Sequence, residues 1–207
     1  MPACQLTSRM GIFTIVLTLI SLPMTVLINR SIITPYKLPM NPRRSLEILL
    51  TPHELSKPYM LYLTPGLLAA TSLHSFCVTL VAGSMRLLLV GAGPATAEEQ
   101  ISVSWWRLLV FMIFQCLAVG YLVPLEVIST RLSIQPNTGG VVQDDEAMPE
   151  GVEYCGTDED VIGLRPTSSP YQGLLDCGRT IAEEEGVGSL YRAWWWTMLS
   201  NVAGVFA

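Results

Sequence analysis

The sequence predicts an all-α protein, a multi-pass bundle of transmembrane helices, and three observations carry this prediction. Charged residues make up only 14% of the 207 residues and hydrophobic residues make up 50%, whereas a soluble domain usually has about a quarter charged residues. Several long stretches carry no charged side chain. An eight-residue pattern, "PMTVLINR" at 23–30 and "PLEVISTR" at 124–131, occurs near the end of two such stretches. We therefore expect about four membrane helices joined by short interfacial helices.

The uncharged stretches define the expected spans in chain order. They cover residues 11–29, 58–85, 108–125 and 193–207. A helix needs roughly 20 apolar residues to cross the core of a bilayer, so the first three are long enough and the fourth predicts a final helix that is cut short. A signal peptide is the alternative for the first stretch. No small-x-small cleavage pattern follows it, so we interpret it as a membrane span.

Matches along the chain divide it into two repeats. Pro23 matches Pro124 at an offset of 101 residues, and the pair Leu61-Tyr62 matches Leu190-Tyr191 at an offset of 129. The 28-residue difference between these offsets predicts an insertion in the second copy. We therefore expect repeats at residues 1–92 and 102–207, a short loop at 93–101 and an acidic, disordered insertion at 132–170. Repeated units around a central site are common in secondary transporters.

The insertion has the composition of a solvated loop. Residues 132–170 hold eight acidic residues against one base, Arg165. Such a segment cannot bury enough apolar surface to fold alone. Its alternative role is to bind a cation or a protein partner through the acidic side chains.

The repeated pattern predicts a gate at one end of the helices. A proline inside a helix removes a backbone hydrogen bond and bends the helix, and Pro23 and Pro124 place this bend at equivalent positions. Arg30 and Arg131 follow seven residues later, nearly two turns on, and so lie on a similar face at the membrane edge. The simpler interpretation is that each proline only interrupts its segment and each arginine only marks the membrane boundary. Because the whole pattern recurs, we favour the gate.

A short amphipathic helix is expected after the insertion. In "YQGLLDCGRTIAEEEG", residues 171–186, apolar residues recur at helical spacing and charged residues fill the opposite face. This pattern is typical of a helix that lies in the membrane interface. Gly186 is expected to end the helix, and Leu190 and Tyr191 lead the chain back into the membrane.

These motifs resemble the signature of the mitochondrial carrier family, in which a proline is followed by an acid and two bases. After a loop and a short helix come an acid–glycine pair and a re-entry motif that ends in a base and a glycine. The second copy matches this signature at Pro124, Glu126, Arg131, Tyr171, Gly173, Asp176, Cys177, Glu185, Gly186, Leu190, Tyr191 and Arg192. The first copy matches it at Pro23, Arg30, Leu61 and Tyr62, with Thr25 in place of the acid.

The resemblance implies an incomplete helical bundle of mitochondrial-carrier type, because the family has three repeats and the copies here resemble the second and third. Ala193 replaces the last glycine of the signature. Ile28 and Ser129 stand where the family has bases that pair with acids of neighbouring repeats. Glu126 then lacks its usual base, and Arg131 or Arg30 is its expected partner. The implied matrix gate consists of Pro23, Arg30, Pro124, Glu126 and Arg131.

The resemblance further implies a membrane solute carrier that moves a small metabolite across the mitochondrial inner membrane by alternating access. The outer membrane is the alternative location. The substrate is expected to contact positions in mid-membrane that follow the two Leu-Tyr pairs, namely Thr71, Ser72, Ser200 and Asn201. These side chains are small and uncharged, and their alternative role is to bridge neighbouring helices.

A carrier-derived membrane protein that no longer transports, and acts in membrane organisation or partner docking, is the second hypothesis. The incomplete gate and the acidic insertion favour it. An enzyme is not expected, because the sequence has no nucleophile–base set or phosphate-binding loop. Its five cysteines and two histidines are scattered, so we expect no metal site and no cofactor. No basic aromatic patch indicates nucleic acid. The expected partners are the lipid bilayer and a small-molecule substrate.

Overall fold

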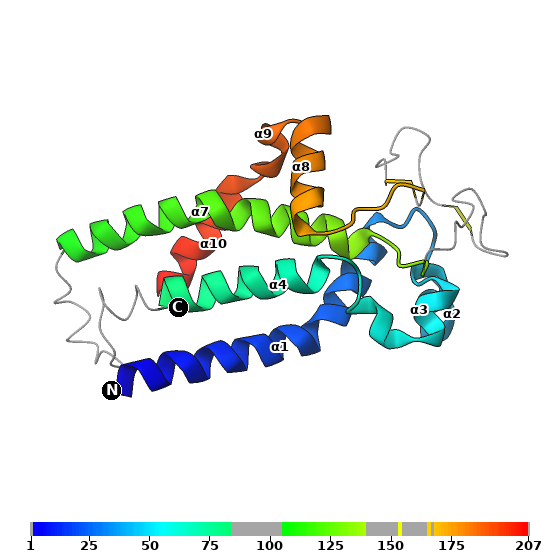
Figure 1. Ribbon diagram of the computed structural model, residues 1–207, viewed down its shortest axis with the longest axis horizontal. Coiled ribbons are helices and arrows are strands. Elements are labelled where there is room, and N and C mark those ends of the chain that lie inside the picture. Colours follow the sequence, from blue (N-terminus) through cyan, green and yellow to red (C-terminus); the bar gives the residue numbers. More distant parts are fainter. Residues whose placement is uncertain (1, 84–104, 140–152, 155–164, 167, 207) are drawn as a thin grey trace. The chain divides into compact units, whose positions relative to one another are not determined.

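The computed structural model describes residues 2–83, 105–139, 153–154, 165–166 and 168–206, which are mainly helical (Figure 1). The longer helices are α1 (Pro2–Ile33), α4 (Leu67–Phe76) with the π-helix η2 (Cys77–Ala82), α7 (Trp105–Ile134) and α10 (Trp194–Phe206). The short ones are α2 (Pro42–Leu49), α3 (Pro52–Ser56), the 3₁₀ helix η1 (Pro58–Leu61), α8 (Leu174–Glu184) and α9 (Val187–Leu190). The described residues contain one isolated β-bridge, between Tyr36 and Tyr154, and no strand. The expected all-α class is confirmed.

Two of the described helices are long and apolar enough to cross a membrane, judged by length and composition. They are Gly11–Ile33 within α1 and Trp105–Ile134, which is α7. Large apolar side chains on both helices are exposed, including Phe13 at 68%, Ile20 at 69% and Leu117 at 70%. Apolar surface of this extent is unfavourable in water and suits contact with lipid. These helices agree with the first and third expected spans.

The second expected span is shorter in the structure than in the sequence analysis. Residues 58–66 form η1 and a turn, and α4 begins only at Leu67. Gly66 lies in this turn with φ of +80°, a conformation that favours glycine. A Cβ at Gly66 would lie 2.4 Å from the backbone N of Leu174. The turn therefore packs directly against the start of α8, and a larger residue does not fit.

The short helices begin where local capping dictates. α2 and α3 each have a proline in the first turn, where its missing N–H costs no hydrogen bond. Asn41 caps α2 and Thr51 caps α3 through their side-chain oxygens. The expected short amphipathic helix is confirmed as α8, and Gly186 follows it with φ of +86°; its place in the membrane interface stays a prediction. Most of the expected insertion, and the loop 93–101, lie outside the described residues.

The described residues belong to two compact units, and each unit draws on both halves of the chain. The first unit comprises Met1–Thr18, Thr71–Val127 and Thr180–Ala207, and the second comprises Leu19–Ala70 and Ile128–Arg179. Helices α1 and α7 contribute their N-terminal parts to the first unit and their C-terminal ends to the second. Buried apolar side chains in the first unit include Phe111, Val119 and Leu122, and those in the second include Leu22, Val26, Leu132 and Cys177.

Candidate functional site at the helix ends

The two repeated patterns occupy equivalent places in the two long helices. Pro23 lies inside α1 and Pro124 lies inside α7, and each helix continues beyond its proline. Arg30 and Arg131 each lie in the last turn of their helix. The structure thus places the four residues in the order that the sequence analysis expects, and their role as a gate stays a prediction.

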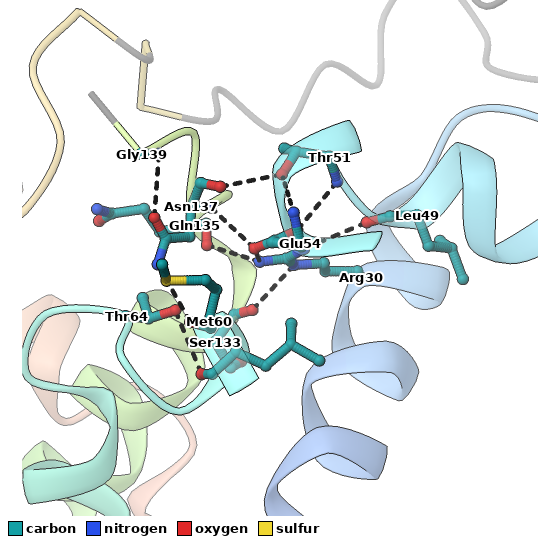
Figure 2. A network of polar contacts seen from close by, with 11 residues as sticks. Arg30, Leu49, Thr51, Glu54, Met60, Thr64, Ser133, Gln135, Asn137 and Gly139 are labelled. Atoms are coloured by element: carbon teal, nitrogen blue, oxygen red, sulfur yellow. Dashed lines mark hydrogen bonds and ion pairs between the residues drawn. The ribbon is translucent and has the colours of Figure 1, made fainter. Parts of the chain in front are cut away.

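Arg30 is the centre of a buried polar network in the second unit (Figure 2). Its side chain is 7% exposed, and that of its partner Glu54 is 0% exposed. Nη1 of Arg30 donates to Oε2 of Glu54 at 2.7 Å, and Nη2 donates to Oε1 at 2.9 Å. Such two-point pairing is among the strongest hydrogen-bonding geometries that arginine makes with a carboxylate.

The remaining N–H groups of Arg30 donate to main-chain carbonyls at helix ends. Nε donates to the carbonyl of Ser133 at 3.3 Å, Nη1 to that of Leu49 at 3.3 Å, and Nη2 to that of Gln135 at 2.8 Å. Helix α7 ends at Ile134 and α2 ends at Leu49, and the last carbonyls of a helix have no partner within it. Every N–H of the guanidinium group therefore has an acceptor, and its charge lies where the helix dipoles are negative.

Glu54 is held in place by the first turn of α3. Its N–H donates to Oγ1 of Thr51 at 3.2 Å, and its Oε2 accepts from the N–H of Thr51 at 3.0 Å. This reciprocal pair is a capping box. Oε1 also accepts from the N–H of Asn137 at 2.9 Å. Each carboxylate oxygen therefore accepts one hydrogen bond from Arg30 and one from the main chain.

The surroundings of Glu54 keep it ionised. Burial by itself raises the pKa of a carboxyl group, because it removes the charged form from water. The hydrogen bonds and the positive charge of Arg30, with the main-chain amides of Thr51 and Asn137, outweigh burial and lower the pKa of Glu54 below its ordinary value. At neutral pH the pair is therefore ionic.

The segment after α7 links the network to two other loops of the second unit. Nδ2 of Asn137 donates to the carbonyl of Met60 at 3.1 Å, and the carbonyl of Asn137 accepts from Oγ1 of Thr51 at 2.9 Å. Gln135 pairs with Tyr171 in both directions, donating at 3.2 Å and accepting at 3.0 Å. The segment after α7 is therefore fixed to η1 and to the residues that lead into α8.

The motif residues expected before and within α8 shape this turn of the chain. Tyr171 is 6% exposed, and the guanidinium of Arg165 lies 4.8 Å from the centroid of its ring, within cation–π range. Asp176 accepts a hydrogen bond from the N–H of Gln172 at 3.0 Å. Gly173 provides the backbone that Gly66 approaches closely. These contacts give Tyr171, Gly173 and Asp176 a structural role.

Tyr191 satisfies a carbonyl that Pro124 leaves unpaired in the first unit. Proline has no N–H, so the carbonyl four residues earlier, that of Gly120, loses its helical donor. The hydroxyl of Tyr191 donates to this same carbonyl at 3.0 Å. In lipid, where water cannot replace a lost hydrogen bond, such a donor stabilises the interrupted helix. The expected re-entry motif therefore supports the expected bend.

The other re-entry residues make local contacts. Glu185 accepts from Oγ of Ser189 at 2.7 Å, and the N–H of Arg192 donates to the carbonyl of Ser189 at 3.2 Å. Leu190 is half-buried in α9. Ala193 has φ of +67°, in the left-handed region that disfavours residues with a Cβ.

Glu126 makes a hydrogen bond to α10, and its expected pairing with Arg131 stays a prediction. Its Oε2 accepts from Oγ1 of Thr197 in α10 at 2.8 Å, within the first unit. Of the two bases considered as its partner, Arg30 has all its N–H groups engaged in the second unit. Arg131 lies in the last turn of α7.

The expected substrate contacts lie on two helices of the first unit. Thr71 and Ser72 belong to α4, and Ser200 and Asn201 belong to α10. Nδ2 of Asn201 is buried without a hydrogen-bond partner among the described residues. The role of all four residues as substrate contacts stays a prediction.

The sequence analysis missed the residues that complete the Arg30 network. The pattern Thr51-Pro52-His53-Glu54 is a capping-box signal and would have indicated a helix start at which the Glu54 carboxylate accepts from the N–H of Thr51. Ser133, Gln135 and Asn137 bond Arg30 and Glu54 through main-chain groups, for which no side-chain pattern exists. Among the described residues, no group of His, Cys, Asp or Glu is placed to hold a metal ion.

The described residues form a helical protein with two helices suited to a membrane, and each of these helices contains a proline and has an arginine in its last turn. Residues 102–207, about half of the chain, match the family model described as mitochondrial carrier protein. The chain belongs to the mitochondrial carrier family, whose members are solute transporters rather than enzymes. The matched range is that of the second expected repeat, although the division into repeats stays a prediction. Neither the curated proteins nor the solved structures gave a match.

Proposed function

We propose that this chain moves a small metabolite across the inner mitochondrial membrane by alternating access. The observation that carries the proposal is the family match over residues 102–207. The two long apolar helices support it, since each contains a proline and has an arginine in its last turn. A helix interrupted by proline and fixed at its end by a charged residue is suited to open and close on one side of a membrane.

The proposed substrate site includes Asn201 on α10. A buried donor without an acceptor costs about 1–3 kcal/mol, and a substrate oxygen within reach of Nδ2 would remove this cost. The substrate would therefore carry a carboxylate, phosphate or carbonyl oxygen. Thr71, Ser72 and Ser200 are the other proposed contacts, and their hydroxyl groups suit the same chemistry.

Exchange in liposomes tests this function. The purified full chain is reconstituted into vesicles loaded with phosphate, malate, glutamate or ADP, and uptake of the same labelled compound is measured. We expect exchange of at least one compound. Asn201→Ala should lower its uptake about tenfold, whereas Leu199→Ala, at a side chain 56% exposed on the same helix, should leave it unchanged. A wild-type chain that exchanges none of the four contradicts the proposal.

A non-transporting role in membrane organisation or partner docking is the second candidate function. The fully engaged guanidinium of Arg30 favours it, because a network with every donor occupied can serve as a permanent clamp. Glu153 of the acidic insertion lies on the surface and pairs with Lys37 at 2.9 Å. Absence of exchange, together with a partner whose binding is lost on deletion of residues 141–160, would select this candidate.

A further inference from the structure

Helix α7 carries a buried glutamine that belongs to none of the motifs described above. Gln115 lies in the N-terminal half of α7, within the first unit, and is 5% exposed. Its apolar neighbours along the same helix face, Phe111, Ala118 and Leu122, are each 1% exposed. Oε1 of Gln115 is buried without a hydrogen-bond partner among the described residues. An unpaired polar atom therefore lies on an otherwise apolar, buried helix face.

An unpaired amide oxygen at this position is unfavourable for folding. A buried polar group without a partner has given up its hydrogen bonds to water and gains none in the protein. Inside a membrane, bulk water cannot replace them. Leucine or methionine, of similar volume, would avoid this cost among apolar neighbours. Side chains that weaken folding in this way occur at functional sites, where the missing partner is a ligand.

A second unpaired amide lies on a helix that packs against α7. Nδ2 of Asn201 in α10 is buried without a hydrogen-bond partner among the described residues. Asn201 follows Thr197 by about one turn and shares its face of α10, and Thr197 donates to Glu126 of α7 at 2.8 Å. Glu126 follows Gln115 by about three turns and shares its face of α7. Both unpaired amides therefore lie on the faces by which α7 and α10 meet.

The course of α10 brings Asn201 toward Gln115 rather than away from it. In Figure 1, α10 runs from α9 toward the side of the view on which α7 begins. Gln115 lies in that first half of α7, whereas Glu126 lies in the second half. Asn201 follows Thr197 along α10, so it lies on the Gln115 side of the contact between Thr197 and Glu126.

Gln115 and Asn201 need partners of opposite kind. Oε1 of glutamine accepts a hydrogen bond, and Nδ2 of asparagine donates one. A ligand that satisfies both must carry a donor and an acceptor. Charged groups make the stronger hydrogen bonds, so an ammonium group suits Gln115 and a carboxylate suits Asn201. An α-amino acid carries both groups, whereas phosphate and the simple dicarboxylates have no N–H.

We infer that Gln115 is a further substrate-contact residue, which accepts a hydrogen bond from the ammonium group of an α-amino acid whose carboxylate binds Asn201. This inference rests on the proposed substrate site at Asn201 and narrows the substrate class to amino acids. Gln115 then selects against analogues without the ammonium group, because these leave its oxygen unpaired.

The same substitution at two glutamines tests whether the Gln115 amide is unpaired. Gln115→Leu in the full chain should raise the melting temperature in detergent by about 2–12 °C, because it removes the unpaired group. Gln135→Leu is the matched control and should lower the melting temperature, because Gln135 donates to Tyr171 at 3.2 Å and accepts from it at 3.0 Å. Gln115→Met, with an unbranched and adaptable side chain, should raise the melting temperature even where leucine does not fit.

Thermal stabilisation by added compounds tests the ligand without a need for transport. The common α-amino acids are added singly to the wild type, and each one that raises the melting temperature is compared with its analogue that has hydrogen in place of the ammonium group, such as glutarate for glutamate. We expect at least one amino acid to raise the melting temperature by about 2 °C or more, and its analogue to raise it by less than about half as much. In Gln115→Leu and Gln115→Met, stabilisation by the amino acid should fall to that by the analogue. In liposomes, uptake of that amino acid should fall about tenfold in both variants.

Three results would overturn the inference. The first is a lowered melting temperature in both Gln115 variants, which means that the amide is paired in the folded chain. The second is a raised melting temperature with stabilisation by the amino acid unchanged, which means that a buried water satisfies Gln115. The third is a wild type that no amino acid stabilises. Failure of the proposed transport has a different signature, since an amino acid would then stabilise the wild type but not the Gln115 variants, and liposomes would exchange none.

Discussion

Substitution of Glu54 by glutamine should destabilise the chain more than the same substitution at Glu47 or Glu153, whose ion pairs are exposed. The side chain keeps its size but loses its charge, and the guanidinium of Arg30 stays buried. All four hydrogen bonds to the carboxylate come from donors, two from Arg30 and one each from the main chain of Thr51 and Asn137. In glutamine one of the two oxygens is replaced by an NH₂ group, which donates and cannot accept. This NH₂ group would face N–H groups of Arg30 and of the main chain, so at least one contact becomes repulsive.

The magnitude follows from the burial of the pair. Removal of one partner from a buried ion pair costs about 3–5 kcal/mol. For a chain of this size, each 1 kcal/mol lowers the melting temperature by roughly 2–4 °C, so we expect a loss of about 6–20 °C. The exposed pair of Arg43 and Glu47, at 3.5 Å with side chains 89% and 53% exposed, contributes about 0–1 kcal/mol. Glu47→Gln should therefore stay within about 4 °C of the wild type.

Tryptophan emission during a thermal ramp in one detergent measures both variants. Replacement of Arg30 and Glu54 together by methionine and leucine should not restore stability, although such double replacements often do for buried pairs. The reason is that five main-chain groups, at 49, 51, 133, 135 and 137, would lose their partners. A melting temperature of Glu54→Gln within 2 °C of the control, or full recovery in the double variant, would refute this reasoning.

Four further predictions follow from single contacts. Ala193→Gly should raise stability by about 1 kcal/mol, because glycine removes the strain at φ of +67°, and an unchanged melting temperature would exclude that strain. Tyr191→Phe should lower the free energy of unfolding by about 1 kcal/mol, since it deprives the carbonyl of Gly120 of its donor. In Pro124→Ala the alanine N–H can donate to this carbonyl instead, so an equal loss from Tyr191→Phe in that background would disprove this cause. Gly66→Ala should lower the free energy of unfolding by roughly 3 kcal/mol, because the new Cβ clashes with the backbone of Leu174. A melting temperature equal to that of the wild type would show that the turn moves to accommodate the methyl group. Because folding lowers the pKa of Glu54, its ionisation contributes to the free energy of unfolding. This contribution is fully present above the ordinary pKa of 4.5 and is lost as pH falls through the lower pKa of the folded state. In urea titrations at several pH values, Glu54→Gln should therefore lose less stability on acidification than the wild type.

The sequence predicted the two long helices because these depend on local signals, although both extend beyond the expected spans, α1 to Ile33 and α7 to Ile134. Apolar runs fixed the positions of α1 and α7, and the charge pattern after the insertion predicted α8. The expected span over 58–85 was too long, since apolar composition alone does not distinguish a turn from a helix when both are uncharged. Gly66 marks that turn through a close backbone approach to Leu174, which is a tertiary contact and leaves no periodic pattern.

The partner of Arg30 was not predictable from the repeated pattern. Arg30 was expected at a membrane edge, with Glu126 among its candidate partners, but a buried arginine selects the acid that the fold presents with the best geometry. Glu54 is presented by the capping box of α3, and the carbonyls at the end of α7 complete the set. Main-chain groups have no identity in the sequence, so only the fold reveals them.

The role of Tyr191 was predictable in kind but not in detail. A proline inside a membrane helix requires a substitute donor for the carbonyl one turn earlier, and the sequence analysis placed Pro124 inside such a helix. The donor is the hydroxyl of Tyr191, 71 residues later in the chain. Which of the seven tyrosines in the sequence meets this carbonyl depends on where the fold places the turn between α9 and α10.

Reversible cross-linking of the two helix ends is the most direct test of whether they separate during transport. The side chains of Asn29 and Ser133 touch, with Nδ2 and Oγ 2.7 Å apart, so Asn29→Cys/Ser133→Cys can be joined by a short, reducible thiol reagent. In liposomes loaded with the exchanged compound, we predict that the joined protein loses uptake at least tenfold, that reduction restores it, and that each single cysteine variant is unaffected. Uptake by the joined protein at the wild-type rate would contradict the account.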